Sequence, residues 1–166
     1  MTTSSNGSKL YLFGLAFIAA LGGFLFGYDT AIISGTLSFV RTQFELNALT
    51  EGWYVSSAIV GCIVGVAGAG FLSDRFGRKI SLLLAGFLFL ISALGCAITP
   101  DHSFLITARL IGGMGVGIAS MLSPLYISEI SPPQYRGRLV ALYQFAITLG
   151  ILVAYFANTG LLNHSL

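Results

Sequence analysis

Two charged side chains, Asp29 and Arg109, lie within long apolar stretches of the sequence. A charge at the centre of a membrane helix costs about 2.5 to 3.5 kcal/mol on insertion scales, so such residues face a bundle interior or a water-filled cavity. The proton affinity of a buried aspartate depends on a nearby cation and on access of water. The chemistry predicted is reversible protonation of Asp29 beside Arg109. A buried ion bridge that only fastens two helices is the structural alternative.

Gln144, Ile147 and Ile151 form a second candidate site. Their spacing places them on one face of a helix. An amide both donates and accepts hydrogen bonds, and apolar side chains beside it suit a neutral ligand that carries many hydroxyl groups. An interhelical hydrogen bond from Gln144 is the structural alternative.

The sequence offers no catalytic or metal-binding constellation. Its apolar stretches contain no nucleophile with a nearby histidine, no metal-ligand cluster and no paired catalytic carboxylates, and His102 and His164 fall outside them. We therefore predict no enzyme activity, no bound metal and no cofactor. A net charge of +2 is too small and too scattered to indicate nucleic-acid binding.

The composition predicts the elements that must position these residues. Apolar residues make up 55% of the chain and charged residues 8%, against about 45 to 50% and 25% in soluble domains. Five apolar stretches are near the length of about 20 residues that a membrane helix needs, at 10–40, 53–72, 80–98, 104–127 and 139–157. The chain is predicted to be an all-α membrane protein. At about 1.5 Å per residue, Asp29 and Arg109 both lie about 6 to 7 Å outward of the membrane middle, so they can pair.

The basic residues predict the orientation, because Lys and Arg near the ends of spans favour the cytoplasm. One side of the predicted membrane carries Lys9, Arg75, Arg78, Lys79, Arg136 and Arg138, and the other carries Arg41. We therefore expect a cytoplasmic tail at 1–9, transmembrane helices within 10–157, and an extracytoplasmic loop at 158–166.

The segment GFLSDRFGRK, residues 70–79, is predicted to form a tight cytoplasmic hairpin. Gly70 and Gly77 permit close approach and unusual backbone angles. Asp74 can cap a helix N-terminus, and the cations can pair with acids. A loop that is merely positive, as topology requires, is the alternative.

Glycines recur inside two of the apolar stretches. Gly61 and Gly65 stand four residues apart in the second, and the fourth contains Gly112, Gly113, Gly115 and Gly117. A dinucleotide-binding loop would need a preceding strand, which is absent from the pattern. Small residues on membrane helices instead allow backbones to pack closely.

These segments resemble a known family. The hairpin at 70–79 resembles the cytoplasmic signature of the major facilitator superfamily. The segments GYDTAIISG (27–35), RLIGGMGVGIASMLSPLYISEISPPQYRGRL (109–139) and YQFAITLGILVAYFAN (143–158) resemble the sugar-porter family, and most closely bacterial proton-coupled pentose and hexose symporters. The resemblance implies twelve helices in two six-helix halves. This chain would supply five helices of the N-terminal half and would need the missing C-terminal half as its partner.

The resemblance also implies roles for individual residues. Asp29, with Arg109, accompanies proton coupling. The face with Gln144, Ile147 and Ile151 lines the sugar cavity, together with Phe26 and Thr30. Glu129, Arg75 and Arg136 belong, with the hairpin residues Gly70, Asp74, Gly77 and Arg78, to a cytoplasmic ion network that controls the conformational cycle.

The function implied is sugar/proton symport by alternating access, in the plasma or inner membrane, with a pentose or hexose and protons as ligands. The fragment alone is not expected to transport. A passive sugar uniporter and a sugar sensor that does not transport are the alternatives. Asp29 argues against the uniporter, and a sensor has no need for a membrane-embedded titratable pair.

Overall fold

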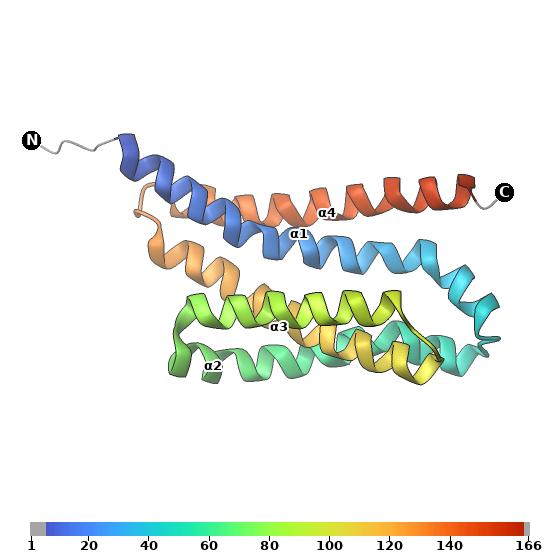
Figure 1. Ribbon diagram of the computed structural model, residues 1–166. Coiled ribbons are helices and arrows are strands. Elements are labelled where there is room, and N and C mark those ends of the chain that lie inside the picture. Colours follow the sequence, from blue (N-terminus) through green and yellow to red (C-terminus); the bar gives the residue numbers. More distant parts are fainter. Residues whose placement is uncertain (1–5, 165–166) are drawn as a thin grey trace, which may run out of the picture.

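The computed structural model describes residues 6–164, and the side chains of 14, 17, 18 and 20–160. Within that range the chain forms the helices α1 (Asn6–Gln43), α2 (Ala48–Ala97), α3 (His102–Ile130) and α4 (Arg136–His164), joined by short turns. Figure 1 shows the helices running side by side along one bundle. All four are long and apolar enough to cross a membrane. The prediction of an all-helical membrane protein is confirmed.

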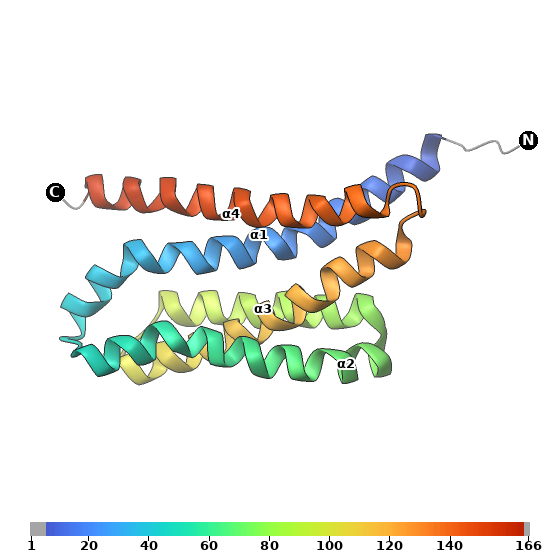
Figure 2. The same cartoon turned by 180° about the vertical axis from the view of Figure 1, so that it is seen from behind.

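Gly77 divides α2 into two arms, residues 48–76 and 78–97. Its backbone angles, φ 81° and ψ 161°, are not helical, and glycine adopts a positive φ without the steric cost of a Cβ. The chain reverses here, so the arms lie side by side (Figures 1 and 2). The predicted hairpin is confirmed at Gly77. Gly70 lies within the first arm, and a Cβ there would meet no described atom within 4 Å. The predicted role of glycine at this position stays a prediction.

The helices extend beyond the apolar stretches that predict them. α1 begins at Asn6, within the expected tail 1–9, and α4 continues to His164, within the expected loop 158–166. A helical backbone satisfies its own hydrogen bonds, so it continues past the point where apolar residues end. The expected tail and loop are therefore partly helical.

Side-chain caps define where two helices begin. Asn47 Oδ1 accepts from the backbone N–H groups of Leu49 and Thr50, at 3.0 Å each, and starts α2. Asp101 Oδ1 accepts from Phe104 N at 2.8 Å and starts α3. Both caps satisfy backbone donors that have no partner within the first helical turn.

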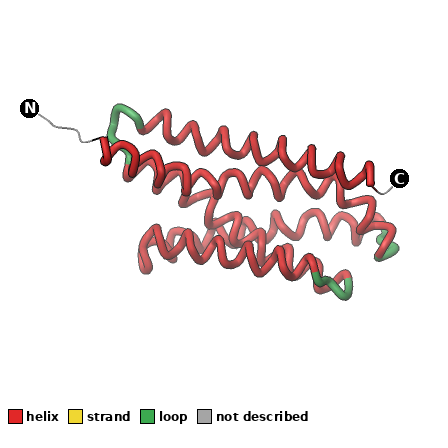
Figure 3. Tube along the Cα trace, turned by 45° about the horizontal axis from the view of Figure 1, so that its top comes forward, coloured by secondary structure: helices red, strands yellow, loops and turns green. Residues whose placement is uncertain are grey.

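The bundle has two layers. α2 and α3 pack together in one, and α1 and α4 pack together in the other, as the views from both sides and from above show (Figures 1, 2 and 3). The glycine pattern explains the first layer. A Cβ at Gly61 or Gly65 of α2 would strike the backbone carbonyl of α3, and a Cβ at Gly113 or Gly117 of α3 would strike the backbone carbonyl of α2. The predicted close packing of small residues is confirmed.

The second layer is built in the same way. A Cβ at Gly27 of α1 would strike the carbonyl of Ile147, and a Cβ at Gly150 of α4 would strike the carbonyl of Phe24. Asn158 Nδ2 donates to the carbonyl oxygen of Ala31 at 3.2 Å. α1 and α4, which are far apart in the sequence, are therefore held with their backbones in contact.

The outward surfaces are apolar. Large exposed apolar side chains occur on every helix, among them Phe17, Ile63, Leu83, Met121 and Phe156. An exposed apolar surface of this extent would be unfavourable in water and is the normal lining toward lipid.

We expect Gly65→Ala to destabilise the fold by about 1 to 3 kcal/mol, because its methyl group would overlap the backbone of Met114. Gly86→Ala is the matched control, since Gly86 is also helical in α2 but has open space around it. Unfolding midpoints of the purified protein in detergent measure the difference. Equal midpoints for the two variants would contradict the close packing of α2 on α3.

Candidate functional site

The predicted pair of Asp29 and Arg109 forms. Arg109 Nη2 lies 3.7 Å from Asp29 Oδ2, an ion-pair distance too long for a hydrogen bond. The Arg109 side chain is 8% exposed and the Asp29 side chain 27%. The pair joins α3 to α1 and so bridges the two layers. Its carboxylate is the more accessible partner.

A third residue contacts this pair. The Arg109 guanidinium carbon lies 5.2 Å from the centroid of the Tyr54 ring on the first arm of α2, and Tyr54 is 3% exposed. Tyr54 was not predicted from the sequence. Trp53 and Tyr54 are adjacent aromatic residues near the N-terminal end of α2, a pattern typical of the membrane interface. The structure gives the two residues different environments, because Tyr54 is buried while Trp53 is 57% exposed.

The Arg109 guanidinium is incompletely hydrogen-bonded. Its Nε and Nη2 atoms are buried and have no hydrogen-bond partner among the described residues. Buried donors normally find partners, and each exception calls for an explanation. A guanidinium without a full set of fixed partners can change its position when the charge of its carboxylate changes.

The predicted sugar-binding residues lie on adjacent helices. Phe26 and Thr30 are on α1, and Gln144, Ile147 and Ile151 are on α4. The Thr30 hydroxyl donates to the carbonyl oxygen of Phe26 at 2.7 Å. Gln144 is exposed, whereas Ile147 packs against the buried cluster of Ile127, Leu139 and Tyr143. Part of this predicted face is thus a contact between helices.

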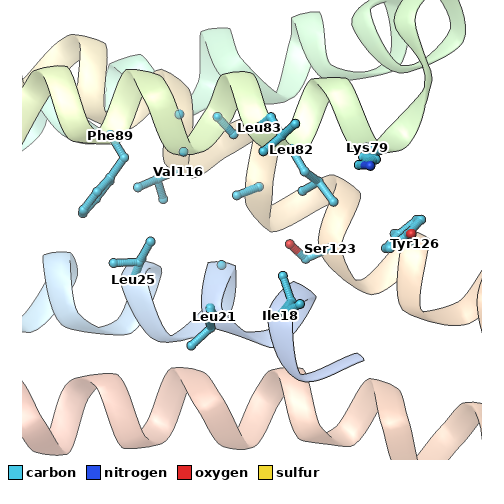
Figure 4. A pocket seen from close by; sticks show the side chains of 15 residues that line it. Ile18, Leu21, Leu25, Lys79, Leu82, Leu83, Phe89, Val116, Ser123 and Tyr126 are labelled. Carbon is cyan, nitrogen blue, oxygen red and sulfur yellow. The ribbon is translucent and has the colours of Figure 1, made fainter. Parts of the chain in front are cut away.

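The crevice in Figure 4 lies elsewhere, between α1, the second arm of α2 and α3. It has a volume of about 390 Å³ and a mainly apolar lining, with Lys79, Ser123 and Tyr126 at one end. None of the five predicted sugar-binding residues lines it, nor do Asp29 and Arg109. It is therefore separate from both candidate sites.

The charge network at the hairpin centres on Arg78. Its Nη2 lies 3.1 Å from Glu129 Oε1 and its Nε donates to the same oxygen at 3.2 Å. Its Nη1 donates to Ser73 Oγ and lies 3.8 Å from Asp74 Oδ1. The hydrogen bond to Glu129, with the negative charges of Glu129 and Asp74, raises the pKa of Arg78 above its usual value. The network ties the hairpin to the end of α3.

Two predicted members of this network stand apart from it. Arg75 and Arg136 form no ion pair among the described side chains, and Arg75 lies beside the ring of Phe76, 5.8 Å from its centroid. Asp74 pairs with Arg78. It lies inside the first arm of α2, before the break at Gly77, and not at a helix N-terminus, so the structure does not show the predicted capping role.

Among the side chains that the structure describes, no group of three or more His, Cys, Asp or Glu residues could hold a metal ion. Cys62 and Cys96 are free thiols.

These features define an all-helical, multi-pass membrane protein with a charged pair inside its bundle. A family model described as "Sugar (and other) transporter" matches residues 15–165. The chain belongs to this sugar transporter family of the major facilitator superfamily, a family of transporters and not of enzymes.

Individual relatives and a solved structure are also similar to this chain. The chain is 51% identical over 140 residues to the arabinose-proton symporter of Bacillus subtilis (strain 168), covering 84% of this chain and 30% of that relative. It is 44% identical over 185 residues to the D-xylose-proton symporter of Escherichia coli (strain K12), covering 95% and 37%. The structure of the proton:xylose symporter XylE bound to 6-bromo-6-deoxy-D-glucose matches with a TM-score of 0.88 at 40% identity, over 94% of this chain and 38% of that one. The chain thus spans about a third of the length of these relatives.

We expect Arg78→Gln to lower the thermal stability more than Glu129→Gln, because Arg78 also contacts Ser73 and Asp74. The double variant should be about as stable as Arg78→Gln alone, because both substitutions remove the same ion pair. Arg75→Gln is the matched control, since it alters a neighbouring cation outside the network. Unfolding midpoints at low and high salt measure the coupling, and screening should reduce it. Additive losses in the double variant would contradict the pairing.

Proposed function

We propose that this chain is the N-terminal part of a secondary transporter that couples the movement of a monosaccharide to the movement of protons. The observation that carries the proposal is the ion pair between half-buried Asp29 on α1 and buried Arg109 on α3. Intramembrane ionisable residues are functional candidates by default. The names of the relatives, which are proton symporters of arabinose, galactose and D-xylose, support it.

The proposed whole protein has twelve helices in two halves. In this proposal the two arms of α2 count as separate spans, so the chain provides five helices of the N-terminal six-helix half. The partner would be the C-terminal half of the same transporter. The N-terminus and the 70–79 hairpin would face the cytoplasm of a plasma or inner membrane, because six basic residues gather on that side. Residues 158–166 would begin the following segment outside.

The proposed coupling rests on the unequal exposure of the pair. Asp29 is accessible enough to exchange a proton with water, while Arg109 is nearly buried. When Asp29 takes up a proton, the electrostatic attraction to Arg109 is lost and α1 is no longer tied to α3 by charge. Protonation of Asp29 thereby weakens the electrostatic attraction between the two layers. This loss shifts the equilibrium between the two conformations of the transporter.

The proposed sugar site uses neutral groups on α1 and α4. Gln144 is exposed on α4 and supplies both a donor and an acceptor. Phe26, Thr30, Ile147 and Ile151 would flank it, and the other half of the protein would complete the site. The substrate class is a pentose or hexose.

The cytoplasmic network has a proposed gating role. Arg78, Glu129 and Asp74 link the hairpin to the end of α3, and Gly77 provides the turn that brings Arg78 there. Gly70, Arg75 and Arg136 would act in another conformation of the cycle. Opening the cytoplasmic side would require these ion pairs to separate.

We expect Asp29→Asn, in the full-length transporter, to abolish the accumulation of sugar against a gradient. Asparagine keeps nearly the same size but takes up no proton in the physiological range. Exchange of internal for external sugar, which needs no net proton movement, should continue. Uptake by vesicles with an imposed pH gradient, compared with counterflow in the same vesicles, measures both activities.

Folded protein must be quantified alongside Asp29→Asn, because an unpaired Arg109 destabilises the bundle and would lower both activities together. A variant that still concentrates sugar, and stops when the gradient is collapsed, would show that Asp29 is not the coupling residue.

We expect Gln144→Ala to weaken sugar binding about tenfold, the effect of losing a hydrogen bond worth about 1.4 kcal/mol to a neutral ligand. Thr159→Ala is the matched control, since Thr159 is exposed on the same helix and its hydroxyl donates to the carbonyl of Tyr155. Titration of the purified full-length protein with the sugar measures the affinity. An unchanged affinity in Gln144→Ala would remove this residue from the site.

A further inference from the structure

We propose that Tyr54 is a positioning residue for proton coupling, whose ring face holds the Arg109 guanidinium while Asp29 carries a proton. This inference rests on the proposed function, because it assumes that Asp29 is protonated and deprotonated during the cycle. It adds to the charged pair an uncharged third member on a different helix.

The geometry fits a cation–π contact. The guanidinium carbon lies 5.2 Å from the ring centroid, within the distance of about 6 Å at which a cation and an aromatic face attract each other. Tyr54 is 3% exposed and the Arg109 side chain 8%. The attraction is stronger in such a site than at a surface, because water does not compete for the cation.

The contact is fixed by the backbone. Tyr54 lies at the outer end of the first arm of α2, near the cap at Asn47. The Ser57 hydroxyl donates to its carbonyl oxygen at 2.8 Å, and Gly113 of α3 abuts the backbone of Ala58. The ring and Arg109 therefore belong to the same closely packed layer. Asp29 belongs to the other layer.

The Tyr54 ring and Asp29 lie in different layers, so they can stabilise Arg109 in different protonation states. With Asp29 ionised, Arg109 has a counter-charge at 3.7 Å. With Asp29 neutral, the cation is buried without one, a state that is strongly destabilised. In this proposal the guanidinium moves onto the Tyr54 ring when the carboxylate attraction is gone, so the cation–π contact is stronger with Asp29 neutral than with Asp29 ionised. The ring therefore lowers the free-energy cost of protonating Asp29.

The neighbouring groups do not replace the ring. The Cys96 thiol on the second arm of α2 lies near enough to feel the charges of both Arg109 and Asp29, but it offers no π face. On the α4 side, neutral Asn158 contacts the α1 backbone at Ala31. Among the described residues, Tyr54 is thus the aromatic partner of Arg109.

The test follows the protonation of Asp29 directly. Infrared difference spectra of the full-length transporter, recorded across a pH titration, show the C=O stretch of a protonated carboxylic acid. The band is assigned to Asp29 by its loss in Asp29→Asn. We expect Tyr54→Leu to move the midpoint of this band about one unit toward lower pH, the size that a desolvated cation–π contact implies.

Matched variants separate the ring from the hydroxyl and from packing. Tyr54→Phe keeps the π face, so its midpoint should stay near that of the wild type. Tyr143→Leu removes another buried tyrosine, on α4, and should lower stability without moving the midpoint. If Tyr54→Leu does not fold, fluorinated phenylalanines at position 54 retain the ring shape while weakening its negative face, and the midpoint should fall with each added fluorine.

The outcomes are distinct. An unchanged midpoint in Tyr54→Leu or across the fluorinated series overturns the inference, as does a shift in Tyr54→Phe equal to that in Tyr54→Leu. A spectrum in which Asp29→Asn removes no band overturns the proposed function, because Asp29 then does not titrate. A band lost in Asp29→Asn and shifted only by changes to the ring supports both.

Discussion

Backbone contact between α2 and α3, made possible by Gly61, Gly65, Gly113 and Gly117, determines where the charged groups of this protein lie. In lipid there is little hydrophobic force between helices, so close packing supplies the attraction. Toward one end of the contact, Tyr54 meets Arg109, and at the other Arg78 meets Glu129. Each pair joins α2 to α3. The layer of α2 and α3 therefore holds the Arg109 cation inside the bundle and the Arg78–Glu129 ion pair beside the hairpin.

The second layer, α1 with α4, is equally close-packed but differs in its chemistry. It contributes one charge to the bundle interior, Asp29, and otherwise neutral groups such as Gln144 and Asn158. Between the layers, Asp29 and Arg109 supply an electrostatic tie that depends on protonation, whereas packing within each layer does not. This division suits rigid elements that move relative to one another, a common basis of conformational switching.

Much of this arrangement could be predicted from the sequence. Counting residues from the ends of two apolar stretches was enough to place Asp29 and Arg109 at one level, and glycine spacing was enough to predict the α2–α3 contact. The identity of the network arginine could not be predicted. Arg75, Arg78 and Arg136 are equivalent in sequence, and only the turn at Gly77 brings Arg78 to Glu129. Tyr54 could not be predicted, because the direction of its side chain depends on the rotation of the helix about its axis. The adjacent aromatic residues Trp53 and Tyr54 do not by themselves show which of them faces the bundle. The ends of α1 and α4 that extend beyond the apolar stretches could not be predicted either, because they lack the apolar pattern from which a membrane helix is recognised.

The pairing of α1 with α4 also has a consequence for biosynthesis. The α2 and α3 layer is continuous in sequence, so it can assemble as soon as it emerges from the ribosome. α1 precedes both, yet its main partner α4 follows only after α2 and α3, and Arg109 follows only after both arms of α2. During that interval Asp29 lacks the counter-charge of Arg109, so an ionised carboxylate raises the free-energy cost of inserting α1 into the bilayer. The order of synthesis thus favours a neutral Asp29 during insertion, before its pair with Arg109 has formed.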